Sequence, residues 1–153
     1  MQSIKKFIEK KLKLKVNEEK SKAAKSDRVK FLGMTIVKGL VAISKIAFNK
    51  AMEKVKLLIP RRSHLPIEKT IERFSVWYRG WAAYFGMTQF PSQLKALEAH
   101  ARRRLRARLA VQQKRPRFLV RKLVKMGVSL KRAKVTVYSN KGPWRISHTG
   151  ALE

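Results

Sequence analysis

Residues 67–85 read IEKTIERFSVWYRGWAAYF, and this stretch decides the fold. Its large apolar residues recur at steps of four, three, four, three and four, which is the period of one face of an α-helix. The members of this stripe are Ile67, Ile71, Phe74, Tyr78, Trp81 and Phe85. Pro66 suits the first turn of such a helix, and Gly86 can end it. The stretch therefore predicts a long helix whose aromatic stripe, Phe74, Tyr78, Trp81 and Phe85, packs in the core.

Upstream of this stretch, the sequence predicts a helix, a β-hairpin and a second helix. Apolar residues in the Lys-rich segment 4–16 recur at helical spacing. Over residues 28–43, β-branched and aromatic residues flank Lys38-Gly39, which suits a hairpin turn. Ser44 can then cap a helix through its hydroxyl, and Pro60 ends that helix.

Downstream, three further helices are predicted. The first begins at about Ser92 and carries one apolar face, which we assign to the core: Leu94, Leu97, Ala101, Leu105 and Leu109. Pro116 opens the second helix, which ends at Gly127, and Ser129 caps the third, over residues 130–138. The whole chain thus predicts a mainly α fold, a helical bundle with a small β-hairpin near its N-terminus.

Charge narrows the class of partner. The 153 residues include 38 Lys and Arg against 9 Asp and Glu, which gives a formal net charge of +29. A phosphate backbone relieves such self-repulsion through counterion release, so nucleic acid is the leading partner class. No apolar run of about 18 residues is present to span a bilayer, and no signal peptide is visible. We therefore expect a cytoplasmic protein with no membrane partner.

No set of residues has the spacing of a catalytic or metal centre. The acidic residues include no Asp-Asp or Asp-x-Asp pair that could hold two magnesium ions, and the chain has no Cys. The adjacent acids Glu18-Glu19 suit a solvated, Lys-paired role. His64, His100 and His148 stand far apart, and the first two are expected to make surface or polar contacts. We expect no catalytic residue, metal ligand or cofactor in this chain.

Five arginines lie within residues 102–108, and no acidic residue occurs between Glu98 and Glu153. The planar guanidinium offers paired donors that suit phosphate and can stack on bases. A merely solvated helix face is the alternative, but such a face usually mixes charges of both signs. The block therefore favours contact with nucleic acid.

Two other features bear on nucleic-acid binding, and a third, Gly80, bears on packing. Trp77 and Tyr84 lie away from the centre of the aromatic stripe and are candidates for stacking on unpaired bases. Gly80 within a strong helix costs roughly 1 kcal/mol relative to Ala, which indicates close approach of another helix or of a backbone. Residues 118–138 have the helix, break and helix of a helix-turn-helix, a rhythm that many helical hairpins share.

Several motifs resemble the reverse transcriptases that bacterial group II introns encode. Asn17-Glu-Glu-Lys-Ser21 followed by Phe31-Leu-Gly33 resembles the end of the palm. Arg79-Gly-Trp-Ala-Ala-Tyr-Phe85 and His100-Ala-Arg-Arg-Arg-Leu-Arg106 resemble the maturase-specific, or X, domain, which forms the polymerase thumb. The ending from Gly127 to Ser147, with Lys141-Gly-Pro-Trp-Arg145, is similar to the tail that follows the thumb. The resemblance implies a palm remnant over 1–43, a maturase-specific domain over 44–115 and a basic helical tail over 116–153.

The resemblance also implies a function. Full members of the family bind their intron RNA, assist its splicing as maturases, and copy it into DNA at a Tyr-Ala-Asp-Asp site with magnesium. This sequence lacks that motif. It therefore resembles an RNA-binding thumb from a truncated or split reading frame, in a family where magnesium serves only the full-length polymerase. The residues expected to contact RNA are Lys20, Arg61, Arg62, Arg73, Arg79, Arg102, Arg103, Arg104, Arg106 and Arg108.

Group II intron RNA is the expected partner, and target DNA and a separately encoded fingers-palm fragment are further candidates. Two alternative functions remain open. The chain could be one subunit of a split RNA-directed DNA polymerase, which the palm edge at residues 12–38 favours. It could instead be a DNA-binding helix-turn-helix protein that uses residues 118–138.

Overall fold

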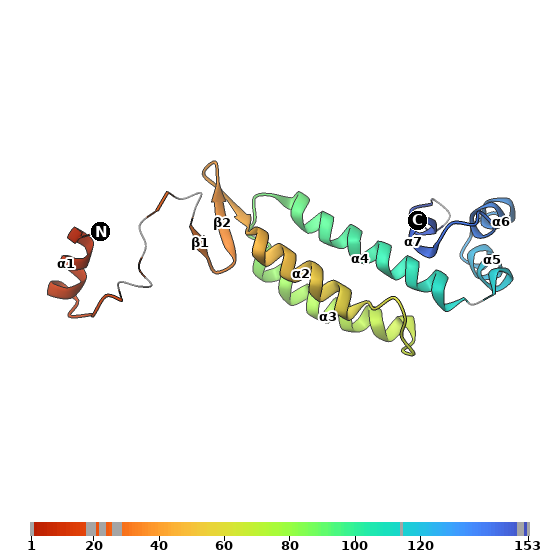
Figure 1. The fold of residues 1–153 in the computed structure, drawn as a ribbon, viewed down its shortest axis with the longest axis horizontal. Helices are drawn as coiled ribbons and strands as arrows, with labels where there is room; N and C mark the ends of the chain where they lie inside the picture. The colour runs from red at the N-terminus through yellow and green to blue at the C-terminus, as the bar shows by residue number, and fades with distance from the viewer. Residues whose placement is uncertain are drawn as a thin grey trace.

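A computed structural model describes residues 2–17, 21, 24–25, 29–113, 115–149 and 152 of the chain. It is mainly helical, with a small antiparallel sheet on the N-terminal side, as the sequence predicts. The elements, in chain order, are α1 (Gln2–Lys11), β1 (Lys30–Phe31), β2 (Met34–Val37), β3 (Leu40–Ile43), α2 (Lys45–Leu58), α3 (Ile67–Phe85), α4 (Pro91–Gln112), α5 (Pro116–Lys125), α6 (Leu130–Val137) and α7 (Pro143–Ile146) (Figure 1).

The sheet contains the predicted hairpin and one additional strand. Strands β2 and β3 are antiparallel, with Val37 opposite Leu40, and the turn between them is Lys38-Gly39. Both turn residues have positive φ, 51° and 80°, as tight hairpin turns require. A second turn of this kind, at Leu32-Gly33, joins β2 to the two-residue strand β1. Two residues are too few to show an alternating pattern, so the sequence does not predict β1 separately.

The outer edge of β3 is covered by two glutamine side chains rather than by another strand. The Val41 N–H donates to Gln89 Oε1 at 2.8 Å, and the Ile43 N–H donates to Gln93 Oε1 at 2.9 Å. Gln93 Nε2 donates in return to the Ile43 carbonyl at 3.0 Å. These bonds satisfy backbone groups that an open strand edge would leave free, and they fix the start of α4 against the sheet.

Helices α2, α3 and the first part of α4 pack around one apolar core. Its buried residues are Ala51, Val55, Ile59, Leu97 and Ala101. The partly buried side chains around it include Phe74, Trp77, Tyr78, Trp81 and Leu105, and Phe85 is itself buried. Trp77 therefore lies with the stripe, its ring centroid 5.9 Å from that of Phe74 and 6.1 Å from that of Trp81. Figure 1 shows α2 and α3 side by side, with α4 continuing beyond them.

A second apolar core joins the end of α4 to α5, α6 and α7. Its buried residues are Leu109, Ala110, Leu119, Val120, Leu123, Ala133, Ile146 and Leu152. Because α4 is 22 residues long, it contributes to both cores and connects the bundle to the C-terminal helices (Figure 1). None of the described helices combines the length and the apolar character needed to cross a membrane.

Two local predictions differ from the structure. The first helix ends at Lys11 rather than at residue 16, because Lys13 adopts a left-handed φ of 52° that a helix cannot continue through. At Gly80 an added methyl group would meet nothing within 4 Å among the described residues. The prediction that another helix or backbone of this chain approaches Gly80 is therefore wrong.

Candidate nucleic-acid interface

The five arginines of the block lie on α4 and point in different directions around it. Arg102 is exposed and donates to Glu98 Oε2, four residues earlier, at 3.3 Å. Arg103 and Arg106 are partly buried. Residues three and four apart share a helix face, so Arg102, Arg103 and Arg106 form one cluster.

Arg104 instead holds the end of α2. Its Nε and Nη2 atoms donate to the Ile59 carbonyl at 3.0 and 2.8 Å, and Nη2 also lies 3.4 Å from the Lys56 carbonyl. The last carbonyls of a helix have no partner within the helix and carry partial negative charge, so a guanidinium is well placed there. Burial, followed by the charge of Arg61, lowers the pKa of Arg104. This side chain is bonded within the protein.

Arg108 lies in the interior, with 1% of its surface exposed. Its two terminal nitrogens donate to Thr70 Oγ1 and to the Leu65 carbonyl, each at 2.5 Å. Burial lowers the pKa of Arg108, and in the described ranges no carboxylate pairs with it. A guanidinium in this position has no surface to offer a phosphate, so we remove Arg108 from the set expected to contact RNA.

The remaining residues expected to contact RNA do not form one cluster. Arg61 and Arg62 are exposed in the loop between α2 and α3. Arg73 and Arg79 are exposed on α3, but at 3.6 residues per turn their directions differ by roughly 120°. Lys20 lies outside the described residues.

A hollow of about 260 Å³ opens between α4 and α7, beside the arginine cluster. Its lining residues are Ala99, Arg102, Arg103, Arg106, Ser147 and His148. The Arg103 guanidinium carbon lies 5.3 Å from the ring centroid of Trp144, which belongs to α7. The sequence assigns no role to Trp144, Ser147 or His148. Pro143 marks the start of α7, but a helix of four residues has no periodicity to show which side chains face α4.

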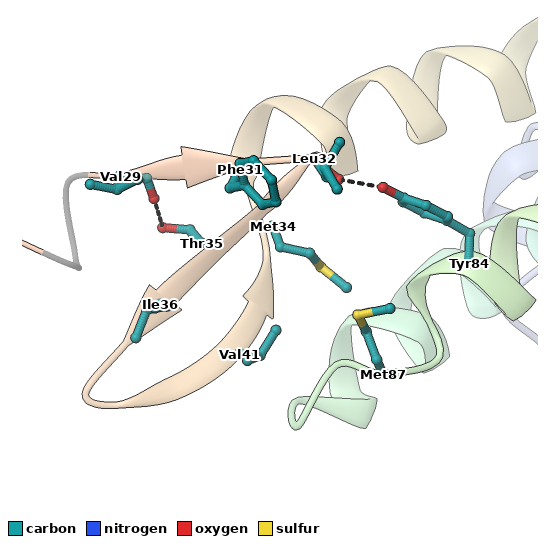
Figure 2. Close-up of a pocket in the computed structure, with 9 residues that line it drawn as sticks. All are labelled: Val29, Phe31, Leu32, Met34, Thr35, Ile36, Val41, Tyr84 and Met87. Atoms are coloured by element: carbon teal, nitrogen blue, oxygen red, sulfur yellow. Dashed lines mark hydrogen bonds between the residues drawn. The ribbon is translucent and has the colours of Figure 1, made fainter. Parts of the chain in front are cut away.

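The C-terminal end of α3 contacts the sheet. Tyr84 donates its hydroxyl to the Leu32 carbonyl at 2.9 Å (Figure 2). An added Cβ at Gly33 would lie 3.1 Å from Phe85 Cζ. The Phe31-Leu-Gly33 segment and the Tyr84-Phe85 pair are therefore two sides of one junction. Tyr84 is 46% exposed, but its hydroxyl is already bonded within the protein.

Beside this junction, residues of the sheet and of the end of α3 line an apolar pocket of about 360 Å³ that is open to solvent (Figure 2). The residues that line it are Val29, Phe31, Leu32, Met34, Thr35, Ile36, Val41, Tyr84 and Met87. Phe31 is 73% exposed and Met87 is 65% exposed. Contiguous exposed apolar surface is typical of sites that contact other proteins or bind apolar ligands.

Helices α5 and α6 pack against each other and are joined by the break at Met126–Ser129. This order of helix, turn and helix is the one that the sequence predicts. They also share the second core with α4 and α7. On the outer side of α5, Arg117 and Arg121 flank the exposed ring of Phe118, at 5.5 and 6.0 Å from its centroid. The C-terminal helices thus add basic surface.

His100 and His148 both lie edge-on to Trp144, each with its ring centroid 6.1 Å from that of the indole, whereas His64 lies in the loop between α2 and α3. His64 and His148 are exposed, whereas His100 is partly buried, and its Nε2 has no hydrogen-bond partner among the described residues. Burial, then the charges of Arg104, Lys56 and Arg103, lower the pKa of His100. Within the described part of the chain, no three His, Asp or Glu side chains come together as metal ligands.

The fold and this surface define a basic, mainly helical protein with arginines gathered along one long helix. Residues 48–127 match the family described as "Group II intron, maturase-specific domain". The match begins within α2 and continues through α3, α4 and α5, and it covers more than half of the chain. The chain therefore belongs to this family, as the C-terminal part of a group II intron maturase. A search of curated proteins finds no match.

Proposed function

We propose that this chain binds group II intron RNA through Arg102, Arg103 and Arg106 of α4 and supports splicing of that RNA without a catalytic step of its own. Membership of the maturase family supports a role in group II intron splicing and mobility. The observation that carries the proposal is the division of the arginine block. Arg104 and Arg108 are bonded within the protein, whereas Arg102, Arg103 and Arg106 face a common hollow.

The charge around this cluster favours a polyanion. No acidic residue occurs between Glu98 and Glu153, so α5, α6 and α7 add only positive charge to the surface beyond the cluster. The exposed residues Arg61, Arg62, Arg73 and Arg79 extend the basic surface over α3 and the loop before it. We keep Lys20 in the proposed set on the sequence pattern alone.

The test is binding of fluorescently labelled intron RNA at several salt concentrations. Each phosphate contact contributes about 0.7 to 0.9 to the slope of log K against log salt. The triple variant R102Q/R103Q/R106Q should flatten this slope by about two to three units and weaken binding. The matched control K45Q/K50Q/K54Q removes the same charge from exposed positions on α2 and should have a smaller effect. Equal effects of both triples would contradict the proposed site.

The class of nucleic acid is tested in the same assay. Intron RNA should bind more tightly than duplex DNA of equal length, because family membership points to the intron RNA. Preference for duplex DNA, with loss of binding on replacement of Arg117 and Arg121, would favour the helix-turn-helix function instead.

The apolar pocket favours a second candidate function, that of a subunit in a split RNA-directed DNA polymerase. In this case the pocket would receive a separately encoded fingers-palm fragment that brings the magnesium site. Mixing the two pieces should then restore primer extension. Replacement of the exposed residues Phe31 or Met87 by Asp should abolish extension while RNA binding stays unchanged. If the mixture extends no primer, this second candidate is rejected.

A further inference from the structure

The hollow between α4 and α7 has an unusual balance of charge. Three of its lining residues are arginines, Arg102, Arg103 and Arg106, and the rest of its lining contains no carboxylate. Glu98 is the nearby acid, and it bonds Arg102 through one oxygen at 3.3 Å. Its other oxygen accepts a hydrogen bond from the Tyr78 hydroxyl at 2.5 Å. Three guanidinium groups therefore have one nearby carboxylate, which Tyr78 also bonds, so the hollow keeps a net positive charge.

The arginines also keep most of their donors free. Each guanidinium carries five N–H groups. Arg103 lies over the Trp144 ring, with its guanidinium carbon 5.3 Å from the ring centroid, and this cation–π contact uses no N–H donor. For Arg106, the described ranges provide no hydrogen-bond or ion-pair partner, although this side chain is partly buried. Donors held in place, partly withdrawn from solvent and without acceptors, are the features of an anion site.

Ser147 and His148, directly after α7, form the opposite wall of this hollow, and α7 is anchored in the second core. Ile146 is buried in the second core, and Ser147 is 1% exposed, with its hydroxyl donating to the Trp144 carbonyl at 2.7 Å. These contacts hold Trp144 and His148, whose ring centroids lie 6.1 Å apart. The position of Arg103 therefore depends on the C-terminal helix as well as on α4.

We propose that this hollow is a phosphate-binding subsite, which holds one internal phosphodiester of the bound RNA. Arg102, Arg103 and Arg106 donate to the phosphate oxygens, His148 borders the entrance, and Trp144 positions Arg103. The proposal rests on the proposed function, because it assigns one defined contact within the RNA surface. A volume of about 260 Å³ has room for a phosphate group and part of its sugar.

The test uses charge-conserving variants of the full chain, since general electrostatics would not distinguish them. Lys keeps the positive charge of Arg but loses the paired donors. R106K should weaken binding of intron RNA by about tenfold, which corresponds to one charge-assisted hydrogen bond. The matched control R117K, at an exposed position on α5, should change affinity by less than about twofold. W144L should also weaken binding, because Arg103 loses its support.

The outcomes separate the two proposals. If the wild-type chain does not bind RNA, the proposed function fails and the subsite fails with it. If RNA binds but R106K and R117K have equal effects at unchanged melting temperatures, the subsite alone is overturned.

The source of the phosphate is decided by two RNAs that differ only in a 5′-phosphate or a 5′-hydroxyl. Equal affinity supports an internal phosphodiester, whereas loss of the R106K effect with the 5′-hydroxyl RNA would overturn it in favour of a terminal phosphate. Inorganic phosphate should compete no better than sulfate at the same ionic strength. Selective competition by inorganic phosphate would likewise overturn the phosphodiester.

Discussion

Replacement of Arg108 by Ala should destabilise the fold and leave the affinity for RNA unchanged. This arginine belongs to the block that the sequence assigns to RNA, yet it is 1% exposed and bonded to Thr70 and Leu65. It therefore connects α4 to the beginning of α3 and to the loop that precedes it. A substitution there removes an internal contact.

The size of the effect follows from these bonds. A hydrogen bond to a charged group contributes about 1.5 to 3 kcal/mol, and Arg108 makes two. The Leu65 carbonyl keeps a bond from Gln112 at 3.3 Å, and relief from burying an unpaired cation offsets a further part of the loss. We expect a net loss of about 3 kcal/mol in the free energy of unfolding. For a chain of this length, the melting temperature should fall by about 6 to 12 °C.

The assay combines unfolding in guanidinium chloride with RNA binding at a temperature where both proteins are folded. R106A is the matched control, and it should show the opposite pattern, with stability within about 0.5 kcal/mol of wild type and weaker binding. If R108A kept its melting temperature and lost RNA affinity, the interior position of Arg108 and its assignment to the fold would both be refuted.

Three other substitutions test the local structure. G80A should raise the free energy of unfolding by about 0.5 to 1 kcal/mol in urea, because a methyl group meets open space within a helix. G33A should lower it by about 1 to 2 kcal/mol, because φ is +79° and the new Cβ would lie 3.1 Å from Phe85 Cζ. Because the pKa of His100 is lowered in the folded chain, the imidazole binds a proton more readily in the unfolded chain. The free energy of unfolding should therefore fall as pH drops below about 6.5. H100Q should lose less melting temperature than wild type between pH 7.5 and 5.5, and an identical loss would contradict the assignment.

The sequence predicts the secondary structure well where local chemistry determines it. Ser44 caps α2 by accepting from the Ala47 N–H at 3.2 Å, and Lys38-Gly39 forms the hairpin turn. The apolar period of 67–85 coincides with α3. These features depend on residues close in sequence, which is why a pattern suffices to find them.

The individual roles of the arginines depend on contacts between distant segments. Arg104 meets the Ile59 carbonyl, and Arg108 meets the Leu65 carbonyl, only because α4 passes the end of α2 and the loop after it. One signal was available in the sequence. Arg104 and Arg108 follow the buried Ala101 by three and seven residues, so they continue the core face of α4 rather than its outer face. The face on which an arginine lies is therefore more informative than the density of arginines around it.

Two motifs of the resemblance, Phe31-Leu-Gly33 and the Tyr84-Phe85 end of α3, contact each other in the structure. Gly33 needs its positive φ for the turn, and its missing side chain leaves space for the Phe85 ring. The motifs thus specify a junction between sheet and helix, and the contacts that their residues make lie within the protein. Any contact with RNA must then come from side chains that the fold leaves unbonded. On α4, Arg103 and Arg106 form no hydrogen bond among the described residues, and Arg102 bonds Glu98. The proposed site therefore lies in the His100–Arg106 motif, apart from the junction that the other two motifs build.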